Sequence, residues 1–151
     1  MTRGMKISVV AASLIGLMMG AAFGVKQGIQ SARSLDEGEL LFISHAAADF
    51  AAEQFKYADV AHAREATLLQ IKLLQLVGRA CPDQSDEKEL GLAYVRLAMI
   101  EKSGDQREAE RAALDMAREY FRRSLPGKEL TDDQMRNVLV QMDEAMERAR
   151  P

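Results

Sequence analysis

The two histidines are the residues whose spacing comes closest to a chemical site. His45 and Asp49 lie four residues apart, and Asp59 and His62 lie three apart, so each pair shares one face of a helix. If the two stretches form an antiparallel hairpin, imidazole and carboxylate groups of this kind can bind zinc or iron. The Glu-x-x-His pairs of di-iron bundles are absent, however, and histidine beside carboxylate is common on protein surfaces. We therefore predict no metal site and no bound cofactor.

The sequence carries no pattern that supports catalysis. It has no nucleophile elbow, no phosphate-binding glycine loop and no zincin motif. A single cysteine, Cys81, excludes an internal disulfide and metal sites built on paired cysteines. The acidic residues fall on the polar faces or at the caps of the expected helices, not as pairs in an apolar setting. We predict that the protein is not an enzyme.

The chain is organised around its first apolar stretch, the 19 uncharged residues Ile7–Val25. As a helix this stretch is about 28 Å long, which matches the hydrocarbon core of a bilayer. Arg3 and Lys6 precede it, so it can be an uncleaved signal anchor, a cleaved signal peptide or a buried helix of a soluble protein. Its length and the lack of an Ala-x-Ala cleavage site at its end favour the anchor.

Small residues recur every fourth position through this stretch and resemble the glycine-zipper pattern of membrane helices. They include Ala12, Gly16, Gly20 and Gly24, within a stripe that runs from residue 8 to residue 32. Small side chains let a second helix approach closely, and close packing drives helix association in lipid. The stripe therefore predicts a face for self-association or for a partner helix.

Basic residues flank the apolar stretch on both sides, with Arg3 and Lys6 before it and Lys26 and Arg33 after it. The positive-inside rule leans toward a cytoplasmic N-terminus. We therefore expect the helical domain on the periplasmic side of a bacterial inner membrane.

The charge of the remaining chain argues against nucleic acid as a partner. Without Arg3 and Lys6, 18 of the 20 basic residues remain against 23 acidic residues, which gives a net charge of −5. Binding to a phosphate backbone needs a basic face instead. The expected partners are therefore the membrane and other proteins.

Apolar residues recur at helical spacing after the membrane stretch, and no segment shows the sustained alternation of a strand. The sequence predicts an all-α fold: one N-terminal transmembrane helix, two helical hairpins and a C-terminal capping helix. The expected divisions are residues 1–6 as an N-terminal stub, 7–25 as the membrane helix, 26–36 as a juxtamembrane linker or helix extension, and 37–150 as the helical domain.

Turn and capping signals predict where these helices end. Tyr57–Asp59 indicates the first turn, and Gly78 is placed as the C-cap of the second helix. Capping boxes are expected at Asp86–Glu89 and Thr131–Gln134, where an acceptor precedes Glu or Gln by three residues. Pro126 and Gly127 end the fourth helix.

Two of the helices have apolar faces that predict their packing. The fourth helix is expected to bury Ala109, Ala112, Ala113, Met116, Tyr120 and Phe121. The last helix is expected to bury Met135, Val138, Leu139, Met142, Ala145 and Met146, and to expose Arg136, Asp143, Glu147 and Arg150. These two faces predict that the last helix covers the second hairpin as a structural element and is not a partner-binding tail.

The stretch Gly104–Ala109 joins the third and fourth helices. Glycine suits a left-handed helix end, Asp105 can cap the next helix, and alanine permits close helix contact. It resembles the hairpin turn of tetratricopeptide repeats, which reads Gly-Asp-x-x-x-Ala, and Ala58–Ala63 is a weaker copy.

In the register of this resemblance, Leu97 and Ile100 fall on packing positions of the first helix of the repeat, and Ala109 and Ala113 fall on small or packing positions of its second helix. The sequence departs from the family pattern in placing Tyr94 early and the closing proline late. Over residues 40–121 the resemblance implies two stacked hairpins with a concave surface that binds peptides or proteins, and it implies no catalysis.

Two functional interpretations follow. The favoured one is a membrane-anchored, non-enzymatic interaction protein that serves as a scaffold or accessory subunit. The alternative is a soluble periplasmic module that binds a ligand or metal and is released by signal cleavage.

Overall fold

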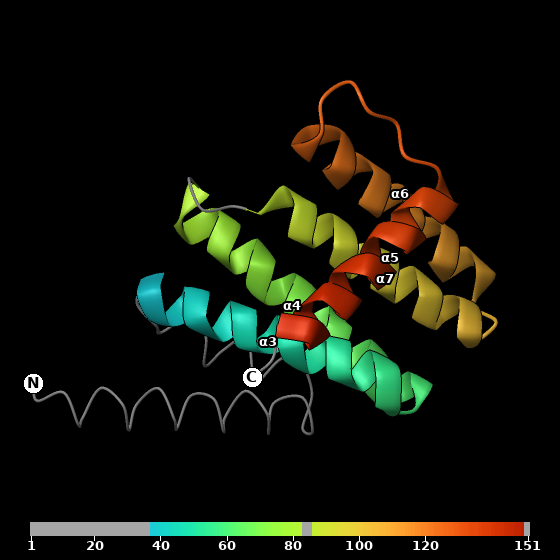
Figure 1. Ribbon diagram of the computed structural model, residues 1–151, viewed down its shortest axis with the longest axis horizontal. Helices are drawn as coiled ribbons and strands as arrows, with labels where there is room; N and C mark the ends of the chain where they lie inside the picture. The colour runs from blue at the N-terminus through green and yellow to red at the C-terminus, as the bar shows by residue number, and fades with distance from the viewer. Residues whose placement is uncertain (1–36, 83–85, 150–151) are drawn as a thin grey trace, which may run out of the picture.

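The computed structural model describes residues 37–82 and 86–149, and this part of the chain is built from α-helices without strands (Figure 1). The helices are α3 (Glu37–Tyr57), α4 (Val60–Ala80), α5 (Glu87–Ser103), α6 (Arg107–Ser124) and α7 (Asp132–Ala149). The prediction of an all-α domain is confirmed. No helix in these ranges combines the length and the apolar character needed to cross a bilayer. The predicted membrane helix, with Ala12, Gly16, Gly20 and Gly24, lies outside the described residues.

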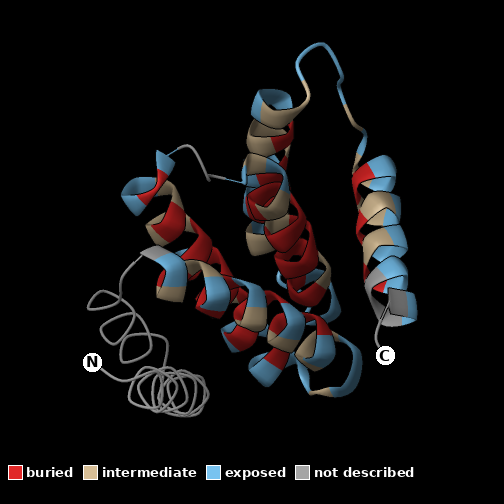
Figure 2. Cartoon of the chain, turned by 60° about the vertical axis from the view of Figure 1, so that its left-hand side comes forward, coloured by how far each residue is buried: buried red, intermediate tan, exposed pale blue. Residues whose placement is uncertain are grey.

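The helices form two antiparallel hairpins followed by a single crossing helix. α3 pairs with α4 and α5 pairs with α6, while α4 also packs along α5 and so joins the hairpins. After the segment 125–131, α7 returns across α5, and Figure 2 shows it as a separate layer beside the second hairpin. The predicted order of two hairpins and a last helix is therefore present.

α5 is the central helix of the domain. Every residue from Leu90 to Glu101 is buried except Tyr94 and Met99, which are half-buried. The larger apolar cluster gathers around it from α4, α6 and α7. A smaller cluster joins α3 to α4; its buried residues are Leu40, Ile43, Ala47, Leu69, Leu73 and Val77. The burial of α5 on most of its circumference makes it the element on which the others are placed.

Side-chain caps begin three of the helices, two of them at the predicted capping boxes. Asp86 accepts from the amide of Glu89 at 2.9 Å at the start of α5. Thr131 and Gln134 form a reciprocal capping box before α7, at 2.9 and 3.3 Å. At the predicted first turn, the Asp59 side chain caps α4 by accepting from the amide of the third residue beyond it, at 3.0 Å.

The roles predicted for Gly104 and Asp105 are wrong by one residue. Gly104 has φ −85°, and the left-handed residue is Asp105, with φ 54°. The amide of Asp105 donates to Lys102 O at 3.1 Å, and that of Gln106 donates to Glu101 O at 2.8 Å. These two bonds form a Schellman motif, which places the left-handed residue one position beyond the C-cap, and Asp is among the residues that tolerate it. Gln106 therefore becomes the N-cap of α6, and no side-chain capping bond to α6 is found there.

Another predicted helix end also differs. α4 continues through Gly78 to Ala80, and the amide of the C-cap residue, Cys81, donates to Val77 O at 2.7 Å. Within this last turn Val77 is buried in the cluster between α3 and α4, whereas Arg79 and Ala80 are exposed. Pro82 then prevents further extension because it has no amide hydrogen.

The buried face of α6 is rotated from the predicted one. Ala112 and Met116 are exposed, and the buried residues of α6 are Ala113, Leu114, Ala117 and Phe121. The phenylalanine ring lies against Gly91 of α5, so close that a methyl group added at this glycine would be 3.2 Å from the nearest ring carbons. This close approach sets which side of α6 meets α5.

α7 packs on the second hairpin, as predicted, but its face differs from the predicted one. Arg136, expected to be exposed, is half-buried, and the side chains of Met146, Glu147 and Arg150 lie outside the described residues. Met135 and Leu139 are buried within the cluster that holds Leu90 and Phe121. Ala145 is exposed, and Asp143, which the sequence placed outside, is only 7% exposed. The carboxylate turns inward because a buried positive charge of α5 lies opposite it.

Candidate functional site

Two of the three buried charged side chains among the described residues meet where α7 crosses α5; the third, Glu101 of α5, pairs with Arg64 of α4 at 2.6 Å. Arg96 of α5 is 3% exposed, and its Nη2 donates to Asp143 Oδ1 at 2.6 Å. Its Nη1 donates to Gln70 Oε1 of α4 at 3.0 Å. One guanidinium therefore joins α4, α5 and α7.

Because Arg96 is buried, its positive charge depends on neighbouring groups for stabilisation. Burial lowers the pKa of Arg96, and the adjacent Asp143 carboxylate opposes that shift. An arginine nevertheless keeps its charge in proteins, so the guanidinium needs a carboxylate beside it. The Nε of Arg96 has no hydrogen-bond partner among the described residues. Two of the three guanidinium nitrogens thus donate hydrogen bonds to described residues, and Nε does not.

A second carboxylate lies within the field of the same arginine. Glu89, two turns earlier on α5, is half-buried, and its pKa is raised mainly by burial and next by the charge of Asp86. The charges of His45 and Arg96 oppose this shift, and that of Asp49 adds to it. Glu89 therefore lies near Arg96 without a hydrogen bond between them being found in the described part of the chain.

The two histidine–carboxylate pairs do not come together as a metal site. His62 Nδ1 lies 2.7 Å from Asp59 Oδ2 at the exposed start of α4. The pKa of Asp59 is lowered, first by the backbone hydrogen bond from His62, and this carboxylate is already engaged as a helix cap. The charges of His45 and Asp49 instead act on Glu89 of α5. Among residues 37–82 and 86–149, no group of three potential metal ligands is found.

The predicted hairpin-packing residues divide between the core and the turn. Leu97, Ile100 and Ala113 are buried. Ala109 is half-buried, and Gly104 and Asp105 are exposed at the turn. Only the first group therefore forms helix–helix contacts deep in the hairpin.

A half-exposed aromatic surface lies between α5 and α6. Tyr94 and Tyr120 stack with ring centroids 5.5 Å apart, and Gln75 of α4 donates to the Tyr94 hydroxyl at 3.3 Å. The Arg123 guanidinium lies 5.5 Å from the centre of the Tyr120 ring, within cation–π range. Met116, on the same helix, is 38% exposed. Tyrosine, arginine and methionine are enriched at protein interfaces.

A cavity of about 380 Å³ lies between the end of α6 and the following segment. Its lining residues are Arg118, Phe121, Arg122, Lys128, Glu129, Leu130 and Thr131. Two of its three cations already have partners: Arg118 pairs with Asp132 at 2.6 Å, and Arg122 with Glu119 at 2.7 Å. With Glu129 also present, the cavity has too little free positive charge to define an anion site.

The sequence contained one signal for the Arg96 site. Arg96 is the sole charge in the run from Leu90 to Ile100, so a helix buried all round must enclose it. Its partners Gln70 and Asp143 carried no comparable signal, because they lie on other helices. Comparison with protein-family models, curated proteins and solved structures finds no match to this chain.

Proposed function

We propose that this chain is a membrane-anchored, non-enzymatic interaction protein, a scaffold or accessory subunit of a bacterial inner membrane. The observation that carries the proposal is the uncharged stretch Ile7–Val25, which is long enough to span a bilayer. It stands directly ahead of the helical domain, with residues 26–36 between them. The weak positive-inside signal supports a cytoplasmic N-terminus and a periplasmic domain.

Two features of the domain support an interaction role. Its surface between α5 and α6 carries stacked tyrosines, an arginine and a methionine, the side chains that form the centres of many interfaces. Two of its buried charges, Arg96 and Asp143, pair between helices, where they specify how one helix sits on another. The stacked hairpins also agree with the tetratricopeptide-like interpretation, in which such surfaces bind other proteins.

Membrane fractionation and intact mass test the anchor together. We expect the full chain to stay in the membrane after alkaline carbonate extraction, with residues 1–25 retained in its mass. Recovery of a periplasmic protein that lacks those residues would replace the proposal with the alternative, a released ligand-binding module. Protease treatment of intact spheroplasts then reports which side of the membrane holds the domain.

The small-residue stripe gives a variant test of association through the membrane. Gly20→Leu places bulk at the centre of the stripe and should weaken helix–helix contact there. We expect less cross-linked dimer or less co-purified partner for this variant in mild detergent. Met18→Leu, on the opposite side of the expected helix, is the matched control and should leave both unchanged. Equal yields for Gly20→Leu and the control would remove the stripe from the interaction.

A further inference from the structure

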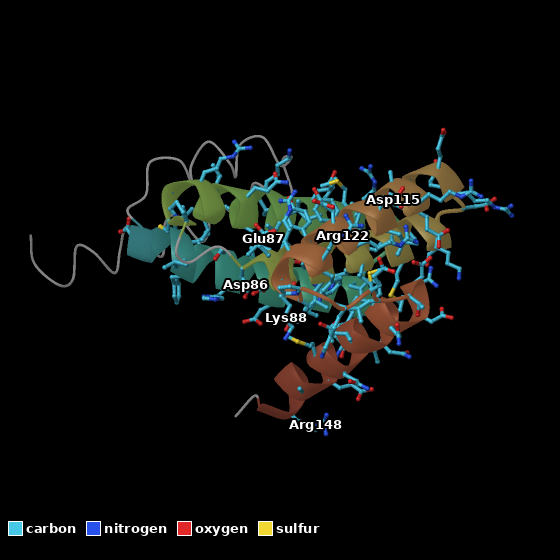
Figure 3. All side chains as sticks on the ribbon, turned by 90° about the horizontal axis from the view of Figure 1, so that it is seen from above. Asp86, Glu87, Lys88, Asp115, Arg122 and Arg148 are labelled. Atoms are coloured by element: carbon cyan, nitrogen blue, oxygen red, sulfur yellow. The ribbon has the colours of Figure 1, made fainter. Side chains whose placement is uncertain are left out.

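The stacked tyrosines lie on the side of the domain that faces away from α7. On α5, Tyr94 lies two residues before Arg96, whose guanidinium meets α7. On α6, Tyr120 lies two residues after Arg118, which also pairs with α7. Because an α-helix has 3.6 residues per turn, residues two positions apart point in nearly opposite directions. In Figure 3, α7 with Arg148 lies along one side of the domain and α4 lies along the other. The tyrosines therefore belong to a face that α7 does not cover.

α4 borders this face with a stripe of four residues. They recur at spacings of three and four and so share one side of the helix: Leu68, Lys72, Gln75 and Arg79. Gln75 joins the stripe to α5 through its hydrogen bond to the Tyr94 hydroxyl, at 3.3 Å. Lys72 and Arg79 lie about one turn to either side of Gln75, and both are exposed. The stripe therefore brings two positive charges to the edge of the aromatic surface.

The domain does not neutralise these two charges. Arg123 of α6, at the opposite edge of the face, pairs with Glu119 at 2.9 Å. Across residues 37–82 and 86–149, by contrast, no ion pair is found for the side chain of Lys72 or Arg79. Glu65, seven residues before Lys72, bounds the basic part of the stripe. Because the chain without its two N-terminal cations carries a net charge of −5, a basic edge is unusual on its surface and favours an acidic partner there.

The centre of the face is apolar. Tyr94 and Tyr120 stack at 5.5 Å and are both half-buried. Met116 lies one turn before Tyr120 on the same helix and is exposed. Tyrosine supplies a large, rigid contact area, and methionine adapts to the shape of a partner. The α4 stripe with Tyr94, Met116 and Tyr120, here called the tyrosine face, thus combines an apolar centre with a charged edge, as protein interfaces do.

We propose that the tyrosine face binds an acidic amphipathic helix of a partner protein. Lys72 and Arg79 are seven residues apart, which is about 10 Å along α4. A partner helix that lies alongside α4 meets both cations with carboxylates that are also seven residues apart. The residues three and four positions after the first carboxylate then face Tyr94 and Met116, and apolar side chains there complete the contact.

A helix fits this face better than an extended segment does. The face is built from three helices, whose backbone groups are already hydrogen-bonded, so it offers no strand edge for an extended chain to pair with. A partner helix satisfies its own backbone groups and needs only side-chain contacts. This partner class deepens the interaction role given above and rests on that role.

Photocrosslinking of the full chain in its native cells tests this partner class. The substitution Met116→p-benzoylphenylalanine places the crosslinker within the tyrosine face, and mass spectrometry locates the crosslinked segment of the partner. We expect a helical segment with two carboxylates seven residues apart and apolar residues between them. The matched position is Val140 of α7, which is also exposed. Val140→p-benzoylphenylalanine should not give this product.

Charge reversal tests the role of the two cations. Lys72→Glu combined with Arg79→Glu should lower the crosslink yield about 10-fold, because two attractive charges become repulsive. Arg111→Glu combined with Arg148→Glu makes the same change in net charge away from the tyrosine face, at two exposed residues, and should leave the yield unchanged. Lysine in place of both carboxylates of the partner should restore the yield of the reversed chain. Circular dichroism checks that each chain is folded, and Lys72→Gln with Arg79→Gln is the milder pair should the reversal disturb the fold.

Several results would overturn the assignment of the tyrosine face. They are no crosslink from position 116, a crosslink to lipid or to a second copy of the chain, and a partner segment without carboxylates. Equal yields for the reversed chain and its control would overturn the role of Lys72 and Arg79. A partner that crosslinks only from position 140, or is lost only with Gly20→Leu, would remove this face and keep the interaction role. Fractionation and intact mass decide the membrane anchor separately.

Discussion

The contact between Gly91 and Phe121 allows a prediction in which two opposing effects are of similar size. Gly91 lies inside α5, where replacement by alanine favours the helix by about 0.8–1.0 kcal/mol. The added methyl group, however, would lie 3.2, 3.2 and 3.3 Å from three ring carbons of Phe121. That ring is 2% exposed and therefore has little freedom to move away.

Overpacking of this kind costs about 1–3 kcal/mol, so the steric effect should exceed the gain in helix propensity. We expect Gly91→Ala to lower the free energy of unfolding by about 1 kcal/mol, the difference between the two effects. Thermal unfolding of the full chain, followed by circular dichroism in the far ultraviolet, measures this as a fall in Tm of a few degrees, by order-of-magnitude scaling.

The decisive comparison is the same substitution made in a Phe121→Leu background. Leucine removes the ring carbons that the methyl group would meet, so only the helix propensity remains. Gly91→Ala should then raise the stability by up to about 1 kcal/mol, which reverses the sign of its effect. An effect of the same sign and size in both backgrounds would refute the contact as the reason for glycine at this position.

Two further predictions concern charge and capping. Burial raises the pKa of Glu89 above its ordinary value, so the folded chain binds the carboxyl proton of Glu89 more tightly than the unfolded chain does. The stability that this group contributes is therefore present below its unfolded pKa and is lost as the pH rises through its folded pKa. As the pH is raised from about 4 to about 7, Glu89 should contribute a fall in Tm, and this contribution should be absent in Glu89→Gln. If Glu89→Gln and the wild-type chain showed the same pH dependence of Tm, that result would contradict the burial of the carboxyl group. Thr131→Ala removes the capping bond to the amide of Gln134 and should lower stability by about 0.5–2 kcal/mol, whereas Thr131→Ser keeps the hydroxyl and should stay close to wild type in the same unfolding measurement.

Helix positions and most helix ends could be predicted from the sequence because their causes are local. Apolar spacing of three and four residues marks a helix whatever packs on it. Asp86 and Thr131 cap helices through amides that lie three residues away in the chain. The left-handed residue of the turn at Asp105 could not be predicted in this way. Which of two adjacent residues becomes left-handed depends on how far the hydrogen bonds of α5 continue, and the local pattern Gly-Asp does not decide that.

The orientation of helices around their own axes required the tertiary structure. The exposure of Met116 and the burial of Phe121 follow from the space that Gly91 leaves on α5. A helical wheel shows a broad apolar face on α6, but it does not show which part of that face meets the neighbouring helix. The aromatic surface formed by Tyr94 and Tyr120 arises in the same way, because each ring comes from a different helix.

By itself, the sequence determined the all-α class and the two hairpins with a last helix. It also supplied the uncharged stretch Ile7–Val25, on which the anchoring proposal rests. Only the tertiary structure decided that Asp143 turns inward to meet Arg96, with Gln70 beside it. A carboxylate on an amphipathic helix is ordinarily solvated, and its burial becomes favourable only when folding brings an opposite charge from a distant part of the chain within hydrogen-bond distance.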